Sequence, residues 1–233
     1  MSGELEKILE KIDGQLALAF SHQAEDAAAL DLLLQCGQGI RGRLEVFTLD
    51  TRKLFPETVA YHKTIEEFFK ITIKIYRPAE AEVEKLEKAL GDEWGMRDSL
   101  ENRRLCCDVR KVVPLGEALH GKNAWITGMR AAQAVTRAGL ALLEWDEKNQ
   151  LIKLNPLCRW TDEELDAYIK ARGIPLHPLY GESFKSIGCS PCTRAVLEGE
   201  DIRAGRWWWE DPSQKECGLH RRPRPGAGQG AHL

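Results

Sequence analysis

Four of the seven cysteines fall into two tight pairs, a pattern that indicates metal or redox chemistry. The first pair is Cys106-Cys107, and the second is Cys189-Ser190-Pro191-Cys192, far along the chain. Four thiolates can bind a zinc ion or an iron–sulfur cluster. Adjacent cysteines strain a single tetrahedral zinc, whereas a cubane distributes its thiolates over separate irons. The spacing favours a cluster, with zinc and unliganded thiols as the alternatives.

A further cysteine, Cys217, lies near the end of the chain among basic residues. His220 follows three residues later, and Arg221 and Arg222 come next. Cationic neighbours lower the pKa of a thiol and so favour the nucleophilic thiolate. Cys217 is therefore a candidate nucleophile, and the alternative is an ordinary exposed cysteine.

Basic side chains are concentrated in two regions. Segment 101–137 includes Lys111 and Arg130, and Arg203 and Arg206 flank a glycine just before three consecutive tryptophans. Guanidinium groups bind phosphate or sulfate through paired donors. These residues could form an anion site, although a solvated charged face is the alternative. The tryptophans are expected to pack in a core or an interface.

The charge balance and hydropathy exclude several classes of protein. The 33 basic and 36 acidic side chains give a net charge of −3, which excludes a uniformly basic coat for nucleic acid. No apolar run approaches the ~20 residues of a membrane span. Residues 1–13 are acidic and amphipathic, so neither a signal nor a transit peptide is visible. We expect a cytoplasmic protein that binds neither membrane nor nucleic acid.

Apolar runs alternate with helical patterns along the chain. The predicted strands cover 16–20, 44–49, 71–76, 124–127 and 151–154. The predicted helices cover 27–35, 56–70, 79–90, 108–119 and 161–172. This alternation predicts an α/β fold with a mostly parallel sheet and helices on both faces.

Several polar residues lie directly after predicted strands. Ser21, Thr51 and Gly128 should therefore line one crevice at the carboxyl ends of the strands, where such folds bind ligands. We expect residues 1–205 to form the α/β domain. Residues 206–233 should form a C-terminal segment, disordered from about residue 221.

Four motifs, in this order, resemble assimilatory adenylyl-sulfate reductases, the iron–sulfur branch of the phosphoadenylyl-sulfate reductase family. They are Cys106-Cys107-Asp108-Val109-Arg110-Lys111, Trp125-Ile126-Thr127-Gly128-Met129-Arg130, Ser186-Ile187-Gly188-Cys189-Ser190-Pro191-Cys192-Thr193-Arg194 and Glu216-Cys217-Gly218-Leu219-His220. The resemblance runs from about Leu16 to His220 and implies an adenine nucleotide alpha hydrolase-like fold with a flexible C-terminal tail.

The resemblance also implies roles for individual residues. Cys106, Cys107, Cys189 and Cys192 would bind a [4Fe-4S] cluster, and Cys217 would be the nucleophile. The substrate would be held by residues of two kinds. One kind consists of the basic side chains and an imidazole: Lys111, Arg203, Arg206 and His220. The other kind lies in the nucleotide-binding segments: Ser21, Thr51, Gly128 and Arg130.

One departure from the family pattern lies in the second loop. The family usually has Leu-Asp-Thr-Gly-Arg, and this chain has Leu49-Asp50-Thr51-Arg52-Lys53. The arginine should add a side chain and a charge where the backbone approaches the ligand.

The implied activity is thioredoxin-dependent reduction of adenylyl sulfate to sulfite and AMP through an S-sulfocysteine. Glutaredoxin is an alternative thiol donor, and the 3′-phosphorylated substrate is an alternative to adenylyl sulfate. Family members often form dimers or tetramers, so a homo-oligomer is compatible with the resemblance. Less favoured are a PP-loop tRNA-thiolating enzyme, whose Ser-Gly-Gly-x-Asp-Ser motif is absent, and a zinc-stapled nucleic-acid-binding protein.

Overall fold

A six-stranded sheet forms the centre of the computed structural model, which describes residues 2–92, 94–134, 137–211, 214–215 and 219. The order of its strands is β3-β2-β1-β4-β6-β5, and every neighbouring pair is parallel except β5 and β6. The strands are β1 (Leu16–Ala19), β2 (Leu44–Leu49), β3 (Lys74–Tyr76), β4 (Ala124–Ile126), β5 (Leu143–Asp146) and β6 (Leu151–Leu154). The predicted α/β fold with a mostly parallel sheet is confirmed.

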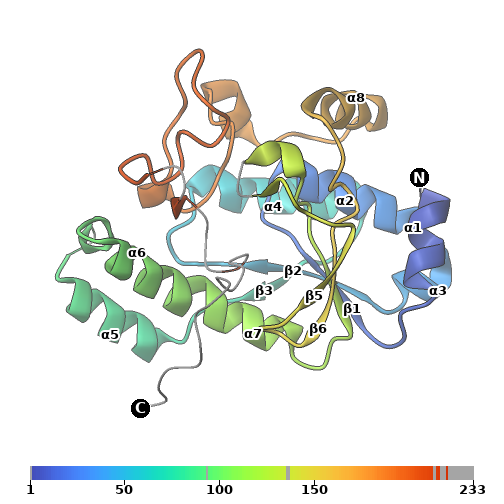
Figure 1. Cartoon of the computed structure of the whole chain (residues 1–233), viewed down its shortest axis with the longest axis horizontal. Helices are drawn as coiled ribbons and strands as arrows, with labels where there is room; N and C mark the ends of the chain where they lie inside the picture. The colour runs from blue at the N-terminus through green and yellow to red at the C-terminus, as the bar shows by residue number, and fades with distance from the viewer. Residues whose placement is uncertain (1, 93, 135–136, 212–213, 216–218, 220–233) are drawn as a thin grey trace.

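Helices cover both faces of the sheet, as Figure 1 shows. The α-helices are α1 (Ser2–Leu9), α2 (Ala24–Leu34), α3 (Gln38–Arg41), α4 (Pro56–Phe69), α5 (Glu80–Leu90), α6 (Leu100–Cys107), α7 (Val113–Leu119) and α8 (Asp162–Arg172). The shorter helical turns are η1 (Gly95–Arg97), η2 (Asp108–Val112), η3 (Ala131–Gln133), η5 (Pro178–Glu182) and η6 (Ser190–Cys192). No helix within the described residues is long and apolar enough to span a bilayer.

Successive side chains of a strand point to opposite faces of the sheet, and this divides the core into two layers. Leu16 and Leu18 of β1 contribute to the larger cluster, beneath α1, α2 and α8. Ala17, between them, packs with Phe47 and Trp125 in a second cluster that contains α7 residues. Because the sheet is covered on both faces, side chains of the central strands are buried whichever face they point to, and this explains the continuous apolar runs in the sequence.

Two strands of the structure differ from the prediction. The third strand was predicted from Ile71, but β3 begins at Lys74, because the Ile73 amide donates to the Glu66 side chain (2.7 Å) instead of to a strand. β5 was not predicted, since Leu-Glu-Trp-Asp is a short alternation between turns. The predicted domain boundary between residues 205 and 206 stays a prediction.

Candidate active site

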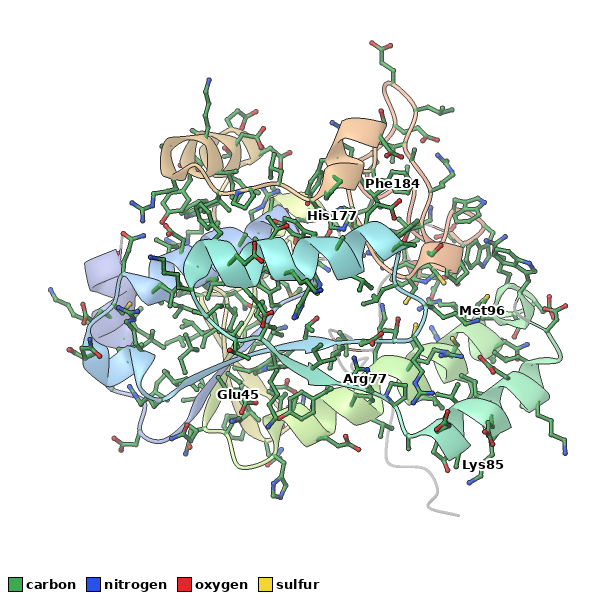
Figure 2. The ribbon with its side chains drawn as sticks, turned by 180° about the vertical axis from the view of Figure 1, so that it is seen from behind. Glu45, Arg77, Lys85, Met96, His177 and Phe184 are labelled. Atoms are coloured by element: carbon green, nitrogen blue, oxygen red, sulfur yellow. The ribbon has the colours of Figure 1, made fainter. Side chains whose placement is uncertain are left out.

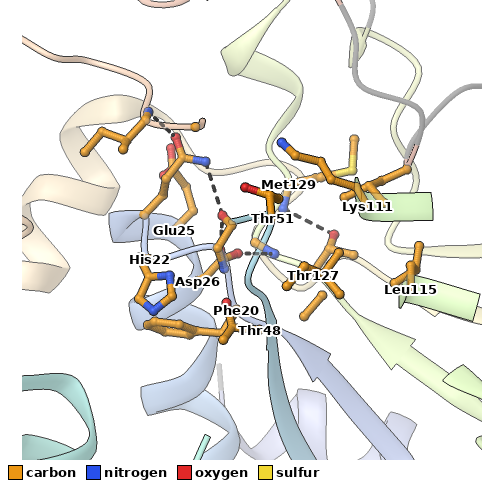
Figure 3. A pocket seen from close by; sticks show the side chains of 18 of the residues that line it. Phe20, His22, Glu25, Asp26, Thr48, Thr51, Lys111, Leu115, Thr127 and Met129 are labelled. Atoms are coloured by element: carbon orange, nitrogen blue, oxygen red, sulfur yellow. Dashed lines mark hydrogen bonds between the residues drawn. The ribbon is translucent and has the colours of Figure 1, made fainter. Parts of the chain in front are cut away.

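A pocket lies where the carboxyl ends of β1, β2 and β4 meet the loops of the last third of the chain. Residues directly after these strands form one wall, among them Ser21, Thr51 and Gly128. Lys111 and the later residues Cys189, Arg203 and Arg206 form another part of the lining. Figure 3 shows Thr51, Asp26, Thr127 and Lys111 around this pocket. The crevice expected from the strand pattern is therefore present.

Asp26 joins the loops that follow β1 and β4. Its carboxylate accepts hydrogen bonds from the Ser21 amide (2.6 Å), the Ser21 hydroxyl (2.5 Å) and the Gly128 amide (3.1 Å). A Cβ at position 128 would lie 2.4 Å from Asp26 Oδ1, so this approach requires glycine. Burial raises the pKa of Asp26 to about 6, although its bonds to Ser21 and Gly128 oppose the shift. Ser21 and Gly128 thus shape the pocket through Asp26.

Arg130 has a different environment from the other predicted substrate-binding residues. Its buried guanidinium donates to Glu25 (2.9 Å) and Asp162 (2.6 Å), and also to the Trp160 carbonyl (3.2 Å). Glu25 lines the pocket, whereas Arg130 is outside its lining. The structure therefore gives Arg130 an ion-pair role next to the pocket wall.

Thr51 connects the pocket wall at the carboxyl ends of the strands to the cysteines. Its hydroxyl lies 3.2 Å from Cys189 Sγ, and its carbonyl accepts from Arg110 Nη1 (2.9 Å). Arg52, in the place of the family glycine, has φ 58° and pairs with Glu80 of α5 (3.3 Å). The added charge is therefore directed towards Glu80 of α5, and its effect on ligand binding stays a prediction.

The two cysteine pairs come together although they are far apart in the sequence. Cys106 and Cys107 end α6, and Cys189 and Cys192 border η6. Cys106, Cys189 and Cys192 pack with Met96 and Trp207 in a third cluster. In Figure 2, Met96 lies at the end of the molecule formed by α5 and α6.

The thiols influence one another's ionisation. Burial, followed by the charges of Cys189 and Cys107, raises the pKa of Cys192 to about 12. Burial and Cys189 likewise raise the pKa of Cys106. Burial also opposes ionisation of Cys189, but Lys111, the Thr51 hydroxyl and Arg206 outweigh it and lower the pKa of that thiol. All four sulfurs therefore belong to one electrostatic group.

This donor set fits an iron–sulfur cluster. In the part of the chain that the structure describes, no three His, Cys, Asp or Glu side chains converge as ligands for a single metal ion. Two buried donors beside the cysteines, Arg206 Nε and Trp207 Nε1, have no acceptor among the described residues. Four thiols with cations and spare donors around them suit an anionic group that has several sulfur acceptors.

Lys111 lies on a π-helical turn between α6 and α7. This turn, η2, follows Cys107 directly, and such turns often occur at functional sites. Lys111 lines the pocket and lowers the pKa of Cys189, so it acts on both the pocket and the cysteines. Residues 100–119 were predicted to be helical only from 108, and α6 was missed because its sequence is rich in Arg, Glu and Asn.

Arg203 and Arg206 are buried and also line the pocket. Arg206 Nη1 donates to the Ile187 carbonyl (3.2 Å), and Arg203 Nη2 donates to the Lys215 carbonyl (3.1 Å). These bonds orient both guanidinium groups in the pocket wall. Together with Lys111 they supply three cations to one pocket, as the basic pattern suggested.

Cys217 and His220 lie outside the described residues. Their described neighbour Leu219 lines the pocket and packs against the core cluster of Ala17, Phe47 and Trp125. The pocket also includes Asp26, Gln133 and Arg137, which were not singled out from the sequence. Asp26 had a signal, because it belongs to the polar Ser21–Asp26 segment that follows a buried strand; the structure places it in the first turn of α2.

Comparison with known proteins agrees with this geometry. Residues 15–195 match the phosphoadenosine phosphosulfate reductase domain. A protein of Allochromatium vinosum named adenosine 5′-phosphosulfate reductase is 43% identical over 94% of this chain and 83% of its own length. A Sinorhizobium fredii protein of the same name is 48% identical over 76% of this chain and 70% of its own length.

Two solved structures share the fold. Phosphoadenylyl-sulfate reductase from Candida auris, in a phosphate complex, superposes with a TM-score of 0.64 at 25% identity, covering 84% of this chain and 96% of that one. Yeast FAD synthetase in complex with FAD superposes with a TM-score of 0.53 at 14% identity, covering 79% of this chain and 59% of that one, which shows the fold alone.

Proposed function

The chain belongs to the phosphoadenosine phosphosulfate reductase family, and from this we propose that it reduces adenylyl sulfate to sulfite and AMP in sulfate assimilation. The observation that carries the proposal is the contact between Thr51 and Cys189, at which a nucleotide-binding crevice meets the four-cysteine site. Relatives named adenosine 5′-phosphosulfate reductase, more than 40% identical, support adenylyl sulfate as the substrate.

We propose that Cys106, Cys107, Cys189 and Cys192 hold a [4Fe-4S] cluster. When bound, this group supplies a compact anionic centre of fixed geometry, and no electron transfer through it is required by the reaction below. The chain's own contribution is to bring Lys111, Arg206 and the Thr51 hydroxyl against Cys189. These groups offset negative charge that would otherwise repel an anionic substrate.

The proposed nucleophile is the Cys217 thiolate, which attacks the sulfur of the sulfate group. A new S–S bond forms while the S–O bond to the AMP phosphate breaks, and AMP leaves with that electron pair. The product is an S-sulfocysteine. Dividing the reduction into two displacements replaces one difficult step with two easier steps.

A thiolate of reduced thioredoxin, or of glutaredoxin, then attacks Cys217 Sγ. Sulfite leaves, and a mixed disulfide forms. The second thiol of the donor resolves this disulfide and restores the Cys217 thiol. The donor's two thiols are oxidised to a disulfide, which balances the two-electron reduction of sulfate to sulfite.

Three cations make this attack between anions feasible. Lys111, Arg203 and Arg206 line the same pocket, and the two arginines are held by backbone carbonyls. Prearranged positive groups stabilise the charge that develops on the transferred group. Thr51, Gly128 and Ser21 would contact the nucleotide part, and His220 would approach the phosphosulfate.

An assay of sulfite release tests the function. The iron-loaded protein should release sulfite from adenylyl sulfate when reduced thioredoxin is supplied, and much more slowly from the 3′-phosphorylated nucleotide. Preference for the 3′-phosphorylated nucleotide would make the chain a phosphoadenylyl-sulfate reductase. A cytoplasmic location is part of the same proposal, because thiol donors of this kind act in a reducing compartment. A homo-oligomer is compatible with the proposal, and the reaction does not require one.

A further inference from the structure

Arg103 lies between the cysteine site and residues 207–211 and 214–215 of the C-terminal segment. The side chain is almost fully buried, at 1% exposure, on α6 one turn before Cys107. Its guanidinium interacts with the Cys107 thiol through hydrogen bonding and charge. One face of this arginine therefore contacts a proposed cluster ligand.

The other contacts of Arg103 go to the C-terminal segment. Nε and Nη2 donate to the two carboxylate oxygens of Glu210, at 2.7 and 2.8 Å, and Nη2 also donates to the Gln214 carbonyl at 3.0 Å. The guanidinium carbon lies 4.8 Å from the centre of the Trp207 ring. In Figure 1, α6 and the orange-red chain that leads into this segment lie at the same end of the molecule.

Both members of the Arg103–Glu210 pair are buried, with side-chain exposures of 1% and 8%. A desolvated charge that loses one of its partners is left uncompensated, so contacts to a buried guanidinium are interdependent. Paired donors also fix the geometry of the carboxylate. Ionised cysteines around a bound cluster would add a second anionic partner for the same guanidinium.

We propose that Arg103 is a positioning residue that couples the filling of the cysteine site to the placement of the C-terminal segment. The coupling is reciprocal: if cluster binding favours the contacts to Glu210, those contacts favour retention of the cluster by the same factor. The proposal goes beyond the proposed function but rests on its assignment of a cluster to the four cysteines. The segment leads directly to Cys217, so its placement would matter for the nucleophile.

A matched pair of variants tests the coupling. Glu210→Gln keeps the volume of the side chain and leaves Arg103 and the cysteines in place. Glu200→Gln removes the carboxylate from a second Arg–Glu pair, with Arg194 at 2.8 Å, which does not involve a cysteine. In iron-loaded protein, a chelator should remove iron at least ~10-fold faster from Glu210→Gln than from wild type, and at the wild-type rate from Glu200→Gln.

Hydrogen exchange, compared between wild type and Glu210→Gln, tests the reverse direction. The amides of Glu210 and Gln214 donate to the carbonyls of Trp207 and Asp211, so neither amide bonds to a cysteine directly. Removal of iron should accelerate their exchange at least ~10-fold, while the amides of α2 stay protected. In Glu210→Gln these amides should already exchange quickly, and removal of iron should add little.

Unchanged iron loss in a folded Glu210→Gln variant would overturn the inference, since a purely structural ion pair would lower the melting temperature without changing iron release. Equal acceleration of exchange in α2 and in the C-terminal segment would also overturn it. Neither readout depends on turnover. Absence of sulfite release together with both expected results would therefore contradict the proposed function and leave the coupling intact.

Discussion

The hydroxyl of Thr51 lies 3.2 Å from the thiol sulfur of Cys189. Thr51 follows β2 at the carboxyl edge of the sheet, and Cys189 belongs to a loop 138 residues further along the chain. This contact joins the crevice expected to bind a nucleotide to the site expected to bind a cluster. A substrate held at this edge of the sheet is consequently within the influence of the cysteines and of the cations around them.

Lys111→Ala should lower kcat/KM for adenylyl sulfate by at least about 100-fold, which corresponds to roughly 2.7 kcal/mol of transition-state stabilisation. The reason is that Lys111 faces both the pocket and Cys189, where negative charges converge. Steady-state kinetics with measured iron content checks the prediction. Lys85→Ala is the control, because Lys85 is exposed on α5, where its ammonium group pairs with Glu82 (2.6 Å), and it is outside the pocket lining. Near-wild-type kinetics for Lys111→Ala in iron-loaded protein would remove its electrostatic role.

Arg203→Ala and Arg206→Ala should mainly raise KM while iron is retained. Both guanidinium groups line the pocket, and neither belongs to the four-cysteine donor set. Paired donors to an anion contribute to binding before the transition state is reached. A loss of kcat with unchanged KM in both variants would contradict a substrate-holding role.

Asp26 should make stability depend on pH. Its pKa is raised from 3.8 to about 6 when the chain folds, so the folded state binds the proton more tightly than the unfolded state. The stabilisation is complete below the unfolded pKa and is lost as the pH rises through about 6, at a cost of about 3 kcal/mol. Asp26→Asn cannot ionise, so its stability deficit relative to wild type should shrink between pH 4.5 and 7.5. Urea unfolding at several pH values measures this difference, and a constant deficit would contradict the raised pKa.

The Arg52→Ala variant should have a lower free energy of unfolding than the Arg52→Gly variant. Its φ of 58° is left-handed, a conformation that costs a residue with a Cβ about 1 kcal/mol. Arg52→Gly and Arg52→Ala both lose the ion pair with Glu80, so their difference in unfolding free energy isolates the backbone term. Position 53 is the control, because Lys53 is not among the described residues with positive φ. At that position the alanine variant should be more stable than the glycine variant. The same order at both positions would contradict this account of the family glycine.

Replacing any one of Cys106, Cys107, Cys189 or Cys192 with serine should abolish stoichiometric iron and lower the free energy of unfolding. The site links two distant segments, so its binding energy contributes to folding. Iron and acid-labile sulfide per chain, with the visible absorption spectrum, provide the measurement. Cys158→Ala is the control, since Cys158 is buried outside the third cluster and should leave the iron unchanged. Full iron content in Cys106→Ser would count against the assignment.

The strands that build the pocket could be predicted from sequence because they are buried on both faces. Their apolar runs are continuous, and residues such as Ser21 and Thr51 mark where they end. The π-helical turn that carries Lys111 could not be predicted, because five residues give no periodicity of their own. β5 was missed for the same reason of length.

The ion pairs of the site could not be predicted from sequence. Arg130 meets Glu25 across 105 residues and Asp162 across 32, so nothing local distinguishes it from an anion-binding arginine. Glu210 likewise pairs with Arg103 across 107 residues. Cysteines could be found because their type and tight spacing already specify chemistry, whereas arginines serve many roles and only their partners distinguish them.

The intact mass of the iron-loaded protein after incubation with adenylyl sulfate, without any thiol donor, tests the central claim most directly. The account predicts an adduct of one SO₃ group per chain, located by peptide mapping on Cys217, with release of one AMP. Reduced thioredoxin should then remove the adduct as sulfite, and Cys217→Ser should form no adduct while keeping the cluster spectrum. Sulfite release by Cys217→Ser at a rate near that of wild type, or an adduct on another residue, would contradict the account.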